Sequence, residues 1–100
     1  MITELALLRI GTGMNDPFEA AFRTVAPLLR QADGYLRHRL VRTLDHDETY
    51  LLDVDWRDLA AHVAGFEPSE THARFMAALA PFLVGEPTVV HVPSHVTESE

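Results

Sequence analysis

Apolar residues recur along this chain with two different periods, and segments of the two kinds alternate. Residues 2–10 are rich in Leu and Ile and precede a Gly-Thr-Gly turn, which predicts a short strand that is apolar on both faces and central in a sheet. Residues 35–44 and 49–56 alternate apolar and polar positions around a short polar turn, which predicts two antiparallel strands. Residues 86–92 predict a fourth strand.

Between these segments, apolar residues recur every three or four positions, as they do in amphipathic helices. The first predicted helix carries the apolar stripe Phe18, Phe22, Val25 and Leu29. Asp16 is expected to cap its start, with Pro17 in the first helical position. Pro27 is expected to kink the helix by displacing a carbonyl group of the preceding turn, and Gly34 to end it in a left-handed conformation.

Two further helices are predicted after the third strand. Asp58 is placed to cap a short helix with the stripe Leu59, His62, Val63 and Phe66. Pro68 ends this helix, and Ser69 is placed to cap the next one. The stripe of that next helix is His72, Phe75, Met76 and Leu79, and Gly85 is expected to end it.

The predicted order of elements, β-α-β-β-α-α-β, is typical of a ferredoxin-like α+β fold with a four-stranded antiparallel sheet and helices on one face. The 100 residues suffice for a single domain, which we assign to residues 1–92, followed by a polar tail at residues 93–100. Each strand of the hairpin within residues 35–56 has one mainly apolar face and one mixed face. A mixed face suits a half-wet cavity or a partner subunit better than open water, so the pattern predicts a dimer.

Composition and charge exclude several classes of protein. The chain has no Cys and no Lys, which excludes disulfides, thiolate catalysis, Cys-ligated zinc and a Schiff-base lysine within it. The net charge of −7 argues against nucleic-acid and anionic-membrane partners, since both need a basic surface. No apolar run reaches the ~20 residues that span a bilayer. The first residues, Met1 to Glu4, lack the basic region of a signal peptide, so we expect a cytoplasmic protein.

Histidines are the candidate chemical groups. His62 and His72 both fall on apolar helical stripes. Two interpretations are open for each: a neutral histidine packed in the core with one nitrogen hydrogen-bonded, or a general base or substrate-binding group in a cavity. His91 and His95 lie four residues apart on a strand and a tail, where the spacing of helical metal ligands does not apply. No metal site is expected.

The hairpin and its aromatic residues add two candidates. One register of the hairpin sets Leu44 opposite Thr49. In that register His38 lies across from Asp55, where a charge-paired histidine would have a raised pKa or form a surface ion pair. The polar turn permits other registers. Most aromatic residues here have the spacing of core residues, and Trp56, at the end of a strand, is the candidate for a pocket wall.

The stretches Trp56 to Ser69, Gly34-Tyr35 and residues 87–91 together resemble three segments of one branch of the antibiotic-biosynthesis monooxygenase family. The stretch Trp56 to Ser69, WRDLAAHVAGFEPS, is similar to that branch's pattern of Trp, Leu or Val, His, Gly-Phe and Ser. Gly34-Tyr35 is similar to the Gly-aromatic pair that starts the family's second strand. Residues 87–91, PTVVH, are similar to its last strand. The resemblance extends from Leu5 to His91.

The resemblance implies a homodimer whose two sheets face each other, a dimeric α+β barrel, with a mostly apolar cavity between sheet and helices in each protomer. It also implies an oxidoreductase: a cofactor-independent monooxygenase that acts on an aromatic or polyketide-like small molecule with O₂ as co-substrate. A sister branch degrades haem with three residues whose counterparts here are Leu8, Phe66 and Met76, none of which matches. Haem is therefore not expected as a cofactor.

On this hypothesis His62 is the candidate base and His91 the second candidate catalytic residue. The candidate substrate-binding residues are Trp56, Phe66, His72, Phe22 and Phe75. One alternative is a non-catalytic dimeric module that binds a small apolar ligand or supports a partner enzyme. Another is a purely structural dimer whose histidines are all satisfied in the core.

Overall fold

The computed structural model describes residues 1–99 and contains one four-stranded antiparallel sheet in the order β2-β3-β1-β4. The elements are β1 (Ile2–Arg9), α1 (Asn15–Arg30), β2 (Tyr35–Arg42), β3 (Thr49–Trp56), the π-helical turn η1 (Ala61–Phe66), α2 (Glu70–Leu79), the 3₁₀ turn η2 (Ala80–Phe82) and β4 (Thr88–Pro93). The predicted ferredoxin-like α+β fold is thereby confirmed. Among residues 1–99, no helix combines the length and apolar character that crossing a bilayer requires.

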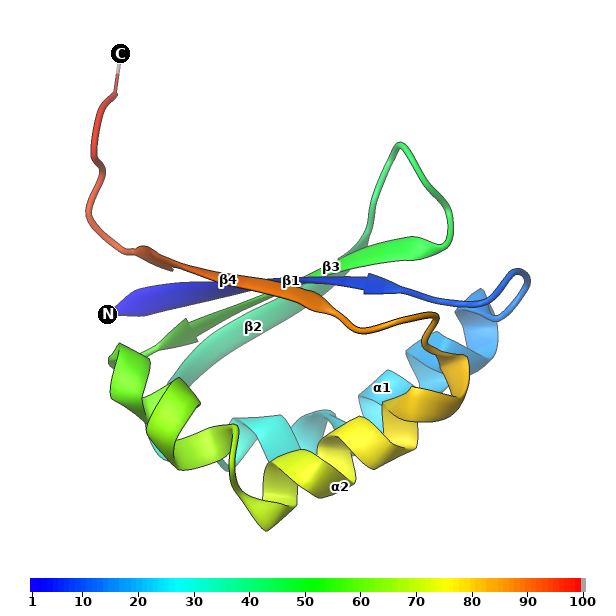
Figure 1. Cartoon of the computed structure of the whole chain (residues 1–100), viewed down its shortest axis with the longest axis horizontal. Coiled ribbons are helices and arrows are strands. Elements are labelled where there is room, and N and C mark those ends of the chain that lie inside the picture. The colour runs from blue at the N-terminus through cyan, green and yellow to red at the C-terminus, as the bar shows by residue number, and fades with distance from the viewer. Residues whose placement is uncertain (100) are drawn as a thin grey trace.

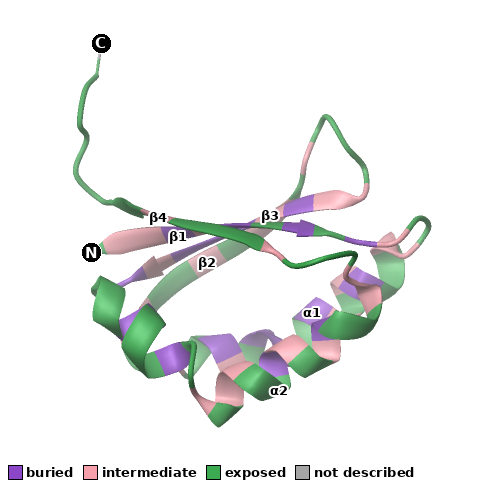
Figure 2. Cartoon of the chain, in the orientation of Figure 1, coloured by how far each residue is buried: buried purple, intermediate pink, exposed green. Residues whose placement is uncertain are grey.

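The helices cover one face of the sheet and leave the other face bare (Figure 1). Strand positions that alternate toward the helices supply one half of the core, including Ala6, Leu8, Leu52 and Val54. The apolar stripe of α1 supplies much of the other half, and buried residues concentrate between the two layers (Figure 2). Residues at even positions of β1 and β3 therefore face the helices, and those between them face outward.

The predicted pairing of His38 with Asp55 is wrong by one residue. His38 pairs with Val54, and Asp55 pairs with Arg37, after a register irregularity near the start of β2. In the predicted register Leu44 lies opposite Thr49. In the structure Thr43 lies there instead, since its amide donates to the Thr49 carbonyl at 2.9 Å, so the turn is one residue longer. Residues that pair directly across two strands have their side chains on the same face of the sheet. Because His38 pairs with Val54, which faces the helices, His38 also lies on the helix side, and its Nδ1 is 2.6 Å from the hydroxyl of Tyr35.

Helix α1 starts differently from the prediction. It begins at Asn15, one residue before the expected cap Asp16, and no side chain caps it. The Asn15 amide group instead donates to the Tyr50 hydroxyl at 2.9 Å, which ties the start of the helix to β3. The helix continues through Pro27 as one element to Arg30. Gly34 follows with φ +88°, the left-handed conformation expected of it.

The segment after β3 forms a wide helical turn. The Ala61 amide donates to Asp58 Oδ1 at 2.8 Å, so the predicted cap is present. The Glu67 amide then bonds the carbonyl of His62 at 2.7 Å, five residues back, which is π-helical spacing. His62 is buried, whereas Val63 on the predicted stripe is 43% exposed, because the wider turn rotates successive side chains differently from an α-helix. Ser69 caps α2 as predicted, with its Oγ accepting from the His72 amide at 3.0 Å.

Candidate active site

A cavity of about 460 Å³ lies between the sheet and the second half of the chain. Its sheet side is formed by inward-facing residues of β1 and β3: Ala6, Leu8, Leu52 and Val54. Its helix side is formed by residues of α1 and α2: Leu29, Phe75, Met76 and Leu79. The volume falls in the range of about 300–1,000 Å³ that is usual for small-molecule sites. A mostly apolar cavity of this size suits a small, mostly apolar ligand.

Four polar groups of the cavity, Glu4, His62, Glu67 and His72, gather toward the end nearest η1. Glu86 lines the cavity elsewhere, just before β4 begins. Glu4 stands on β1 at a position that faces the helices, between apolar neighbours on the same face of the strand. His62 comes from η1, which packs over this end of the sheet. The cavity therefore has an apolar body and one polar end that contains imidazole and carboxyl groups.

Glu4, His62 and His91 lie side by side, with Trp56 packed against them. Trp56 Nε1–H donates to Glu4 Oε1 at 3.0 Å, and His62 Nε2 lies 3.3 Å from the same oxygen. His62 Nδ1 lies 2.8 Å from His91 Nε2. The His62 ring stacks on Trp56 with ring centres 5.0 Å apart and an interplanar angle of 23°. Both ring nitrogens of His62 are therefore engaged by protein groups.

Sheet pairing explains how residues 87 positions apart meet. Glu4 on β1 and His91 on β4 are direct cross-strand partners, so both side chains face the helices side by side. η1 then brings His62 over the pair. Trp56, at the end of β3, is fully buried beneath them. The site depends on β1, β3, β4 and η1 together, which is why no single sequence motif contains it.

Burial shifts the pKa values of these groups in opposite directions. Desolvation lowers the pKa of His62 to about 4, aided by the nearby His91 and His72 and opposed by Glu67. Desolvation raises the pKa of Glu4, against the hydrogen bond from Trp56 and with help from Glu67. Desolvation also lowers the pKa of His72. The imidazole of His62 is therefore neutral near pH 7.

The structure distributes the predicted site residues over several environments. His62, Phe66, His72 and Phe75 line the cavity. His91 lies behind His62, and Trp56 lies behind Glu4 and His62 without lining the cavity. Phe22 is buried and lines a separate surface cleft beside His38 and Arg42.

Sequence reasoning missed Glu4. A signal for it was present, because Glu4 shares its face of β1 with Ile2, Ala6 and Leu8, and a carboxyl group on an otherwise apolar, inward face needs a partner. Among residues 1–99, no group of three or more His, Asp or Glu side chains is arranged so as to hold a metal ion.

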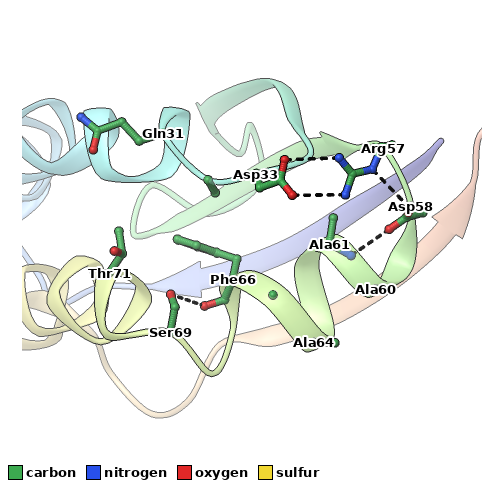
Figure 3. A pocket seen from close by; sticks show the side chains of 12 residues that line it. Gln31, Asp33, Arg57, Asp58, Ala60, Ala61, Ala64, Phe66, Ser69 and Thr71 are labelled. Atoms are coloured by element: carbon green, nitrogen blue, oxygen red, sulfur yellow. Dashed lines mark hydrogen bonds and ion pairs between the residues drawn. The ribbon is translucent and has the colours of Figure 1, made fainter.

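A second hollow lies on the surface beside η1 (Figure 3). Arg57 crosses it and bonds Asp33 at 3.3 and 3.5 Å and Asp58 at 3.4 Å. These three side chains are largely exposed, so their ion pairs are screened by water and the arginine is already neutralised. Phe66 lines both this hollow and the internal cavity and so forms a wall between them. The internal cavity is the better candidate site because it is apolar and contains the buried histidine.

The chain is thus a small α+β domain with a partly open, mostly apolar cavity and a buried imidazole near one end of it. The family of antibiotic biosynthesis monooxygenases matches residues 1–78 of the chain. The chain is also 37% identical over 91 residues to the uncharacterized protein YczJ of Bacillus subtilis (strain 168), which covers 91% of this chain and 96% of YczJ. The chain therefore belongs to the antibiotic biosynthesis monooxygenase family.

Solved structures agree with this assignment. A Bordetella bronchiseptica protein assigned to the antibiotic biosynthesis monooxygenases superimposes with a TM-score of 0.90 at 25% identity, covering 95% of this chain and 97% of that one. SnoaB of Streptomyces nogalater, a cofactor-independent oxygenase, has a TM-score of 0.76 at 22% identity, with 97% of both chains covered. The likeness to SnoaB shows a shared fold.

Proposed function

We propose that this protein is a cofactor-independent monooxygenase that oxidises an electron-rich aromatic molecule in the cavity between sheet and helices. The observation that carries the proposal is the neutral, buried imidazole of His62 at the polar end of an apolar cavity. A base in a dry pocket can remove a proton from a weakly acidic ligand and keep water away from the reactive anion. Membership of the family and the shared fold with SnoaB support the same reaction class.

The reaction balances with O₂ as the sole oxidant. A base removes one proton from an anthrone-like CH₂ group, and the resulting carbanion gives electrons to O₂ and forms a carbon–oxygen bond. The peroxide anion so formed takes up one proton and becomes a hydroperoxide. The hydroperoxide then loses its second C–H proton as the O–O bond breaks and hydroxide leaves. The CH₂ carbon becomes a carbonyl, and the other oxygen atom leaves in water. His62 lines the cavity in which this proton is removed, and His91 lies behind it.

The charges around the cavity support an uncharged substrate. The charged side chains that line it are the carboxyl groups of Glu4, Glu67 and Glu86, and no arginine is among the lining residues within 1–99. An anionic ligand would meet like charges there, which weakens binding in a low-dielectric site. A phenol or anthrone that enters neutral and is deprotonated inside avoids this repulsion.

Oxygen uptake with anthrone tests the proposed activity. We expect the purified protein to consume O₂ in the presence of anthrone, and His62→Gln to lower kcat/KM about 10²–10⁴-fold because it removes a base. His46→Gln is the matched control, since His46 lies exposed in the hairpin turn and is expected to leave the rate unchanged. Full activity of His62→Gln would contradict the role of His62. Saturable anthrone binding without O₂ uptake would indicate the non-catalytic binding module instead.

We also propose that the protein works as a homodimer joined through the bare face of the sheet. On the β1–β4 half of that face, Leu7, Val90 and Val92 are 44%, 52% and 39% exposed. On the β2–β3 half, Arg37 bonds Asp53 at 3.1 Å and Asp55 at 3.2 Å. A second copy of the chain fits this face, because in a two-fold dimer the same face of each copy contacts the other. The apolar residues of one copy then cover those of its partner.

Light scattering tests the dimer. The wild-type protein is expected at twice the 11.2 kDa of one chain, and Val90→Asp is expected to shift it toward the monomer because it sets a charge in the apolar half of the interface. Leu44→Asp is the matched control, since Leu44 is fully exposed in the hairpin turn. A wild-type mass of 11.2 kDa at micromolar concentration would contradict the proposal.

A further inference from the structure

We propose that Glu4 is the group that takes the proton directly from the substrate, and that His62 and His91 pass this proton from the cavity toward the surface. This inference rests on the proposed function. It changes the role of His62 from the base that contacts substrate to a relay behind that base. It also adds to the site a carboxyl group that no sequence motif indicates.

Both ring nitrogens of His62 lie close to other side chains of the protein. Its two ring nitrogens face His91 at 2.8 Å and Glu4 at 3.3 Å, and its side chain is only 4% exposed. Nε2 also lies 3.8 Å from Glu67 Oε2, so both nitrogens are turned toward protein groups. A neighbour of His62 is therefore better placed to take the proton of a substrate in the cavity.

The two carboxyl oxygens of Glu4 have different surroundings. Oε1 accepts from Trp56 and lies beside His62, whereas Oε2 has no hydrogen-bond partner among the described residues. Within residues 1–99, no fully buried side-chain nitrogen or oxygen lacks a partner. Oε2 must therefore reach open space, and Glu4 lines the cavity. This oxygen is the available acceptor at the polar end of the cavity.

The surroundings suit a carboxylate that acts as a base. Burial and the nearby Glu67 raise the pKa of Glu4, so its carboxylate is a stronger base than an exposed one. The groups that face Glu4 and His62 from the elements around them are Trp56 of β3, His91 of β4, Glu67 after η1 and His72 of α2. No arginine side chain among these groups fixes the charge of the carboxylate.

The proton moves without redox change. The substrate C–H or O–H proton bonds to Glu4 Oε2, leaving the substrate anion. In the tautomer of His62 that carries its proton on Nδ1, rotation of the carboxyl group turns the protonated oxygen toward Nε2. Nε2 takes that proton while the Nδ1 proton passes to His91 Nε2, so the ring of His62 ends with its proton on Nε2. His91 is half-buried on the edge strand β4, from which the proton leaves to solvent. One proton enters the relay and one leaves it.

Exchange of the acidic hydrogens of anthrone for deuterium in D₂O, without O₂, measures this proton transfer separately from oxygenation. We expect the wild type to accelerate exchange and Glu4→Gln to lose about 10²–10⁴-fold of that rate, with little change in anthrone affinity. Glu4→Asp keeps a carboxyl group and is expected to exchange faster than Glu4→Gln. Exchange by Glu4→Gln at the wild-type rate would overturn the assignment.

The exit of the relay has its own test, which leaves Glu4 intact. His91→Ala is expected to slow exchange, and added imidazole is expected to restore the rate because it can replace the lost side chain. A lack of any effect in His91→Ala would contradict the relay. A wild-type protein that neither exchanges anthrone hydrogens nor consumes O₂ would instead refute the proposed function itself.

Discussion

Trp56→Ala is expected to lower the free energy of unfolding by about 3–5 kcal/mol, the usual cost of removing a large buried aromatic side chain. Trp56 is completely buried and contacts Tyr35, His62 and Phe66 through its ring. Its removal also deprives Glu4 of a hydrogen-bond donor in a buried position. A domain of this size has only about 5–15 kcal/mol of stability, so this single change removes a large share of it.

Urea denaturation followed by circular dichroism measures the effect. Trp56→Phe is the matched control, because it keeps an aromatic ring and removes the indole N–H. We expect it to cost about 1–3 kcal/mol, the range for loss of a hydrogen bond to a charged or buried acceptor. A loss below about 1 kcal/mol in Trp56→Ala would contradict the packing described for this end of the sheet.

Stability is expected to fall by about 2 kcal/mol between about pH 7 and about pH 5 through His62 alone. The pKa of His62 falls from 6.5 to about 4 on folding, because burial disfavours the imidazolium. In the unfolded chain His62 therefore binds a proton below about pH 6.5, whereas in the folded chain it binds one only below about pH 4. This contribution is complete above pH 6.5 and is lost as the pH falls toward 4.

Other groups act on the same pH profile. His72, whose pKa is also lowered, adds to the loss in acid. Glu4 acts in the opposite direction, because its raised pKa makes the folded state prefer the protonated carboxyl and favours folding as the pH falls. Comparison with His62→Gln isolates the contribution of His62, and His46→Gln serves as the exposed control. An unchanged pH profile in His62→Gln would contradict the burial of a neutral His62.

The fold was largely predictable because its signals are local. A few neighbouring residues are enough to predict each of three features. These are the alternating strands in residues 35–44 and 49–56, the helix cap at Ser69 and the left-handed conformation of Gly34. The hairpin register was not predictable in this way, because the polar turn permits more than one length. Asp16 failed as a cap because Asn15 is tied by hydrogen bonds to the β3 side of the molecule, a long-range contact.

The candidate site was predictable only in part. His62 and His72 could be assigned to inward-facing helical stripes, and both line the cavity. Glu4 could not be assigned to the same site, because its proximity to His62 arises from the pairing of β1 with β4 and the position of η1. Such a group of residues exists only once strands from the two ends of the chain are neighbours.

The most direct test of the central claim follows the fate of oxygen in the cavity. The protein is given anthrone under ¹⁸O₂ in ordinary water, and the product is analysed by mass spectrometry. The proposed function predicts a quinone that carries one ¹⁸O atom, formed faster with the wild type than with His62→Gln. A quinone without ¹⁸O, or one formed no faster than in buffer alone, would contradict it.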